Sequence, residues 1–208
     1  MRYARRALLV VDVQRDFCPG GALAVSCGDE VVPKLNTVIE AFVRARLPIF
    51  FTRDWHPPHH SSFKAEGGRW PPHCIKESEG ARFHPKLKVP KSAFIISKGT
   101  KASMEAYSGF QGTNLKVILR RLDVGEIFVG GLATDYCVKE SALEALAAGM
   151  KVAILADCIK GVDLHPSDSM IALRDVSARG ARLTDSTDAV RLVTREMNSQ
   201  ESRRARIA

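Results

Sequence analysis

Residues 51–63, with the sequence FTRDWHPPHHSSF, contain three of the six histidines in the chain. Asp54 and His56 are separated by one residue, so on an extended backbone both side chains project to the same face. His60 follows a pair of prolines, and His73 lies farther along in WPPHC. An aspartate with two or three histidines forms a ligand set that suits zinc, iron or manganese. The residues alone leave two alternatives open, a metal site and a histidine-rich surface loop.

A second group of reactive side chains follows short apolar runs. Asp12 follows ALLVV, Lys98 follows AFIIS, and Cys137 opens a helical segment after GGLATDY. A thiolate is the nucleophilic form of cysteine, and a nearby cation or helix N-terminus favours it. Lys98 can supply the cation, while Asp12 can accept the thiol proton and deliver it to a leaving group. With backbone N–H groups of the LATDYC turn facing a carbonyl oxygen, this combination is typical of acyl transfer.

The elements that would position these residues alternate along the chain. Strands are predicted at 7–13, 48–54, 93–99, 126–132, 151–158 and 181–185, and helices at 30–46, 113–122, 135–148, 167–178 and from about 187 onward. The alternation predicts a mostly parallel six-stranded sheet in a three-layer α/β/α sandwich. Ligands of such sheets bind beyond the carboxyl ends of the strands. We therefore expect Asp12, Asp54, Lys98 and Cys137 to meet at one edge.

The chain is predicted to form one domain. At 208 residues, we expect a single unit over residues 1–198 and a basic C-terminal tail over 199–208. An insertion at about 55–90 has no predicted element, yet it holds five of the six histidines and both tryptophans. A long irregular segment in a compact domain is usually functional or disordered, and the tryptophans and prolines argue against disorder.

Composition excludes several classes of protein. A hydrophobic content of 45% and a charged content of 26% are ordinary for a globular protein. Apolar runs are too short for a membrane span or a signal peptide, which predicts a cytoplasmic protein. The net charge of +8 comes with no nucleic-acid-binding motif. Five cysteines without a CxxC pair fit neither a disulfide scaffold nor a thiolate zinc site.

Seven segments together point to a family. They are LLVVDVQRDFCPGGALAV, TRDWHPPHHSSF, WPPHC, FHPKL, ISKGT, YSGF and GGLATDYCV, in this order between about residues 8 and 157. With these segments the chain resembles the nicotinamidases (pyrazinamidases), members of the isochorismatase-like cysteine hydrolases. The resemblance favours the metal site over the surface loop. It also implies the isochorismatase-like hydrolase fold.

The resemblance assigns roles to individual residues. It implies a catalytic triad of Asp12, Lys98 and Cys137. It implies an oxyanion hole formed by the backbone N–H groups of Ala133 and Cys137, with a cis peptide between Leu132 and Ala133. The metal ligands that it implies are Asp54, His56, His60 and His73. The substrate pocket that it implies is lined by Phe17, Trp70, Leu132 and Tyr136.

One position departs from the family pattern. His59 stands where an aspartate or asparagine is commoner. We prefer His60 as the ligand, because it holds the offset of the motif from His56.

The activity implied is hydrolysis of a linear amide C–N bond. Nicotinamide would become nicotinate and ammonia in NAD salvage, through a thioester on Cys137, and the isosteric amide pyrazinamide would enter the same pocket. The cofactor would be one divalent metal ion, with zinc favoured over iron or manganese. Nucleic acid and membrane are not expected as partners, and self-association is left open.

Two other functions remain as alternatives. One is another amidohydrolase of the superfamily, such as an enzyme acting on N-carbamoyl compounds, which would share the triad without the histidine cluster. The other is a non-catalytic protein that binds nicotinamide or a metal, which would need no thiol nucleophile.

Overall fold

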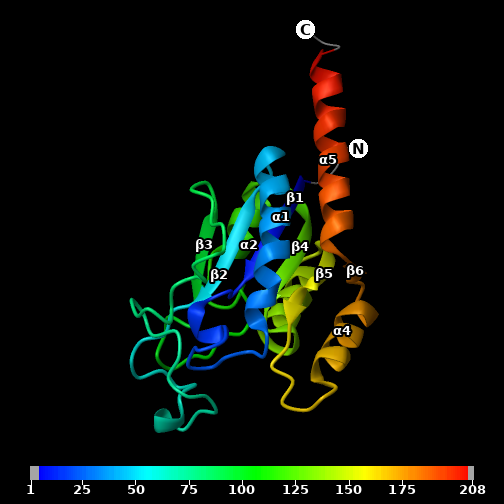
Figure 1. Ribbon diagram of the computed structural model, residues 1–208. Coiled ribbons are helices and arrows are strands. Elements are labelled where there is room, and N and C mark those ends of the chain that lie inside the picture. The colour runs from blue at the N-terminus through cyan, green and yellow to red at the C-terminus, as the bar shows by residue number, and fades with distance from the viewer. Residues whose placement is uncertain (1–4, 206–208) are drawn as a thin grey trace.

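The computed structural model describes residues 5–205 and contains one six-stranded sheet (Figure 1). The strand order is β3-β2-β1-β4-β5-β6, and all neighbouring strands are parallel. The strands are β1 (Arg5–Val11), β2 (Ile49–Asp54), β3 (Phe94–Lys98), β4 (Val124–Leu132), β5 (Lys151–Lys160) and β6 (Arg182–Thr184). All six predicted strands are confirmed.

Helices cover both faces of the sheet, which confirms the three-layer sandwich. The helices are α1 (Val31–Arg44), α2 (Leu115–Arg121), α3 (Lys139–Ala147), α4 (Asp168–Ala178) and α5 (Ser186–Ala205). Helices α1 and α5 lie side by side over one face, and α2, α3 and α4 cover the other. Along β1, Leu8 packs in the core under α1, whereas Leu9 packs in the core under α2 and α3. Because both faces of the strands are buried, their sequences are almost continuously apolar.

The segment between β2 and β3 contains the predicted insertion and has little regular structure. One short 3₁₀ helix, Lys64–Glu66, lies within it. One backbone contact fastens the segment to the sheet: the Trp55 N–H donates to the Lys98 carbonyl at 3.0 Å. Within the segment, the His56 N–H donates to the Cys74 carbonyl at the same distance. In Figure 1 this segment forms the teal loops at the lower left, beyond the ends of β2 and β3.

The C-terminal helix continues farther than the sequence predicts. Because α5 runs to Ala205, residues 199–205 of the predicted basic tail are helical, and residues 206–208 lie outside the described part. Within the described residues, no helix combines the length and the apolar character that crossing a membrane requires.

The carboxyl end of β4 approaches β1 more closely than a side chain would allow. Gly131 pairs with Val11 and has a φ of +125°. A Cβ atom at this position would lie 2.1 Å from the carbonyl oxygen of Val11. Glycine is therefore required just before the turn that leads to Cys137.

Replacing Gly131 with alanine should destabilise the protein by about 3 kcal/mol or more, because the Val11 backbone cannot move without breaking the sheet. Gly149 is a matched control, since it also has a positive φ (+85°) but has no atom within 4 Å of an added Cβ. We expect Gly149→Ala to cost about 1–2 kcal/mol, from backbone conformation alone. Urea unfolding of both variants measures the difference, and equal losses would contradict the role of the close contact.

Candidate functional site

A cavity that is open to solvent lies beyond the carboxyl ends of the strands. Its walls combine reactive and aromatic side chains from the insertion, the β1–α1 segment and the β4–α3 turn. They include Phe17, Val25, Asp54, His56, Trp70, His73, Tyr107, Ala133, Tyr136, Cys137 and Val162.

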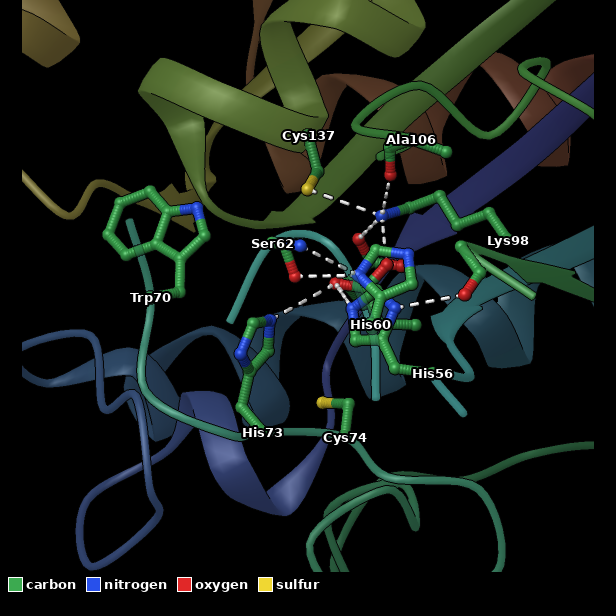
Figure 2. Close-up of polar contacts among 12 residues, drawn as sticks. His56, His60, Ser62, Trp70, His73, Cys74, Lys98, Ala106 and Cys137 are labelled. Atoms are coloured by element: carbon green, nitrogen blue, oxygen red, sulfur yellow. Dashed lines mark hydrogen bonds and ion pairs between the residues drawn. The ribbon is translucent and has the colours of Figure 1, made fainter. Parts of the chain in front are cut away.

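The side chain of Lys98 joins the residues at this edge of the sheet (Figure 2). Asp54 and Lys98 are register partners at the ends of β2 and β3. The Lys98 ammonium donates hydrogen bonds to Asp54 Oδ1 at 2.5 Å, to the Ala106 carbonyl at 3.1 Å and to Cys137 Sγ at 3.4 Å. Asp12 Oδ2 lies 2.8 Å from the same nitrogen. The predicted meeting of Asp12, Asp54, Lys98 and Cys137 is thus seen in the structure.

The ammonium of Lys98 remains charged although it is buried. Desolvation by burial favours the neutral amine, but Asp12 and Asp54 outweigh it and raise the pKa of Lys98 well above its usual range. Burial acts against ionisation of Asp54 too, yet Lys98 and His56 hold the pKa of Asp54 below its usual range. Lys98 and Asp54 therefore form a buried ion pair.

Asp12 differs from Asp54 in its proton affinity. Burial raises the pKa of Asp12, and Lys98 opposes this shift only in part. Its Oδ1 accepts a 2.6 Å hydrogen bond from the Thr52 hydroxyl. Its Oδ2 pairs with the Lys98 ammonium at 2.8 Å. Because burial raises the pKa of this carboxyl, Oδ2 is a buried acceptor that can take up a proton.

Cys137 lies in a single π-helical turn, Thr134–Val138, which continues into α3. Burial raises the pKa of its thiol well above the usual range; Lys98 lowers it in part, and Asp12 adds to the rise. The thiol is thus the stable form, and ionisation depends on the ammonium. The peptide between Leu132 and Ala133 is cis, as the resemblance implied.

Three of the four predicted metal ligands form a compact cluster. Ligand atoms of Asp54, His56 and His73 all lie within 4.8 Å of one another. Asp54 Oδ2 is 3.5 Å from His56 Nε2 and 4.0 Å from His73 Nε2. Nδ1 of His56 faces the Gly99 carbonyl at 3.0 Å, and Nδ1 of His73 faces the Pro71 carbonyl at 2.8 Å.

This cluster fits a divalent metal ion. A carbonyl can only accept, so each Nδ1 donates its hydrogen and each Nε2 keeps its lone pair for a ligand. Burial also lowers the pKa of His73, which favours the neutral imidazole that binds metals. Two imidazole nitrogens and a carboxylate oxygen suit zinc, iron and manganese.

The fourth predicted ligand, His60, faces elsewhere. Its ring lies 4.1 Å from the ring of His56, but its Nδ1 contacts the Ser62 hydroxyl at 2.7 Å and its Nε2 contacts the Met104 carbonyl at 3.2 Å. Both nitrogens are therefore engaged outside the cluster. His59 is exposed and pairs with Glu66, so it does not replace His60.

A second group of potential ligands already contains a cation. Asp12, Asp54 and Cys137 also lie within 4.8 Å of one another. The ammonium of Lys98 contacts all three, so its positive charge occupies the position that a metal would take.

Three of the four residues expected to line the substrate pocket lie on the walls of the cavity. Phe17 and Trp70 line the cavity, and the ring of Tyr136 meets that of Trp70 at 5.3 Å. Leu132 differs from the prediction: it is fully buried in the core on the α1 side of the sheet and does not line the cavity.

Several contributing residues were not predicted. Tyr107 lines the cavity and accepts a 3.0 Å hydrogen bond from the Trp70 indole N–H, although YSGF was a matching segment. The Ala106 carbonyl bonds Lys98, and no pattern of side chains reveals a backbone acceptor. Gln14 and Thr52 are buried polar residues in or beside strands, and this combination could have drawn attention to them.

Comparisons with known proteins agree with this geometry. The family model described as isochorismatase domain matches residues 6–188. The nicotinamidase of Escherichia coli is 40% identical over 199 residues, covering 86% of this chain and 93% of that protein. The crystal structure of a Pyrococcus horikoshii pyrazinamidase in complex with zinc is 46% identical, with a TM-score of 0.84, and covers 87% of this chain and 99% of that one. The crystal structure of PnC1 from L. infantum in complex with nicotinate is 31% identical, with a TM-score of 0.81, and covers 88% of this chain and 94% of that one.

Removing the ammonium of Lys98 should make the thiol harder to ionise. We expect Lys98→Met to slow alkylation of Cys137 by iodoacetamide and to shift its pH profile upward, because desolvation and Asp12 would act unopposed. Mass spectrometry of the Cys137 peptide is the measurement, since Cys27 is exposed and also reacts. Lys139→Met is the control, because Lys139 pairs with Asp175 instead. An unchanged profile in folded Lys98→Met would rule out an action of the ammonium on the thiol.

Proposed function

Because the chain belongs to the isochorismatase family, in its branch of nicotinamidases and pyrazinamidases, we propose that it hydrolyses nicotinamide to nicotinate and ammonia. One observation carries the proposal: a single cavity holds both the thiol of Cys137 and the cluster of Asp54, His56 and His73. An aromatic amide has two functional ends, a ring nitrogen and a carboxamide. The cavity offers one group for each end.

Asp54, His56 and His73 would hold one divalent ion, with zinc favoured by the zinc complex of the P. horikoshii relative. When bound, the ion supplies an open coordination position for the ring nitrogen of the substrate. Phe17 and Trp70 would enclose the ring, and Tyr107 would fix the indole of Trp70 through its hydroxyl group. The carboxamide would then lie over Cys137.

The first half of the reaction would form a thioester. Sγ of Cys137 attacks the carboxamide carbon while its proton passes to Oδ2 of Asp12. The N–H groups of Ala133 and Cys137 donate to the oxygen that becomes negative. Asp12 then returns the proton to the amide nitrogen, the C–N bond breaks, and ammonia leaves.

The second half would return the free enzyme. A water molecule gives a proton to Asp12 and attacks the thioester carbon. The C–S bond breaks, nicotinic acid forms and releases its carboxyl proton to water to give nicotinate, and the proton on Asp12 returns to the thiolate of Cys137. Lys98 stays charged throughout, because its pKa lies well above the usual range, and it stabilises each anion that forms beside it.

The alternatives have less support. An amidohydrolase without a metal would not need the buried cluster of Asp54, His56 and His73. A binding protein would not need a thiol that contacts a buried ammonium. Turnover of pyrazinamide, a role in NAD salvage and a cytoplasmic location stay predictions.

Ammonia release from nicotinamide is the direct test. The purified protein should release one ammonia per nicotinate formed, and Cys137→Ala should release none, because it lacks the thiol that forms the thioester. Nicotinamide binding measured by calorimetry should persist in Cys137→Ala, since the metal cluster does not include the thiol. A protein loaded with zinc, iron or manganese that leaves nicotinamide intact would refute the proposed function.

The metal content of two histidine variants tests the ligand set. We expect His73→Ala to lose affinity for zinc by about tenfold to 100-fold or more, because it removes a nitrogen facing Asp54. His60→Ala should keep zinc near the wild-type level, since both nitrogens of His60 bond outside the cluster. Elemental analysis after dialysis against a weak chelator gives the comparison. Loss of zinc from His60→Ala as severe as from His73→Ala would establish four ligands instead of three.

A further inference from the structure

The segment that follows β1 contacts the backbone of two chain segments that carry candidate metal ligands, one with Asp54 and one with His73. It contains Gln14 and Asp16, on either side of the exposed Arg15. Neither polar residue contacts the thiol or the ammonium of Lys98 through any hydrogen bond of its side chain that the structure shows. Their side chains bond instead to the backbone of two ligand-bearing segments.

Gln14 is fully buried, and its carboxamide forms hydrogen bonds with both the backbone N–H and the backbone carbonyl of Asp54. Its Oε1 accepts the Asp54 N–H at 2.7 Å, and its Nε2 donates to the Asp54 carbonyl at 2.8 Å. The second Nε2 hydrogen goes to the Ala81 carbonyl at 2.9 Å. Both donors and the acceptor of the amide are therefore used.

The course of β1 explains why a side chain takes this position. The backbone pairing of β1 with β2 ends where the Asp12 N–H donates to the Thr52 carbonyl, and Asp12 has a φ of +48°. Asp54 thus lies beyond the last backbone partner that β1 provides. The carboxamide of Gln14 replaces that partner, since an amide side chain offers the same donor and acceptor as a peptide group.

Asp16 bonds the backbone beside His73, as Gln14 bonds the backbone of Asp54. Its Oδ2 accepts the Cys74 N–H at 2.7 Å, and its Oδ1 accepts the Ala22 N–H at 3.2 Å. Cys74 directly follows His73, and its carbonyl accepts the His56 N–H. One carboxylate thus fixes the backbone that connects the two histidines.

We propose that Gln14 and Asp16 are positioning residues that hold Asp54, His56 and His73 in ligand geometry before an ion binds. The inference rests on the proposed function in taking these three residues as ligands, and it adds what keeps them in place. Groups that orient metal ligands typically contribute about tenfold to 100-fold to metal affinity. The orientation of Asp54 matters most, because its carboxylate must keep Oδ1 bonded to Lys98 and Oδ2 facing the histidines at the same time.

Cobalt binding to the metal-free protein tests the proposal. Co²⁺ titration followed by visible absorption reports both affinity and ligand geometry. Gln14→Met, of similar size, removes the three hydrogen bonds, and Asp16→Asn removes one of two acceptors. Arg15→Gln is the matched control, because Arg15 lies between them and its guanidinium pairs with the exposed Glu79. We expect each of the first two variants to bind Co²⁺ at least about tenfold more weakly with an altered spectrum, and the control to match the wild type.

The outcomes separate this inference from the proposed function. A wild-type protein that binds neither Co²⁺ nor Zn²⁺ would refute the proposed function itself. A wild-type protein that binds Co²⁺, together with folded variants of unchanged affinity and spectrum, would refute the positioning role alone. Thermal unfolding of the metal-free variants establishes folding. If Gln14→Met does not fold, Asp16→Asn decides, since it keeps shape and one acceptor.

Discussion

The ammonium of Lys98 is the group on which the rest of the site depends. Burying an isolated charge costs several kcal/mol, so a buried lysine at the end of β3 requires compensating carboxylates. Asp54 provides one from the end of the neighbouring strand β2, and Asp12 provides the other from the end of β1, the next strand along the sheet. The parallel register brings Asp54 opposite Lys98, and the turn after β1 brings Asp12 to the same nitrogen. The arrangement of the strands therefore also provides the charges that neutralise the buried ammonium.

Asp54 belongs to two groups at once. One oxygen bonds the ammonium that contacts the thiol, and the other faces His56 and His73. The carboxylate of Asp54 therefore sets the distance between the thiol of Cys137 and the imidazoles of His56 and His73. In the proposed reaction, a substrate with two reactive ends would have to match this separation, as a small aromatic amide does. The fixed separation would then add to the selectivity that the walls of the cavity provide.

Much of the fold and of the candidate site could be predicted from the sequence, because simple rules connect strand order with the positions of residues at the strand ends. Alternating strands and helices imply a parallel sheet, and a parallel sheet brings Asp12, Asp54 and Lys98 to one edge. Side-chain direction in the irregular insertion follows no such rule. His60 turns toward Ser62 and Met104 because local acceptors and donors are available there. Leu132 precedes a cis peptide, and no periodicity indicates that its side chain enters the core.

The reactive residues come from separate strand–helix units of the chain. Asp54 and Lys98 are 44 positions apart, and Lys98 and Cys137 are 39 apart. A chain emerging from the ribosome therefore carries Cys137 as an ordinary thiol until β1, β2, β3 and β4 have assembled. Only the assembled strands surround the sulfur with charges and exclude water from it. The same sequence spacing that delays the site until folding is complete therefore leaves partly folded molecules without the assembled group of Asp12, Lys98 and Cys137.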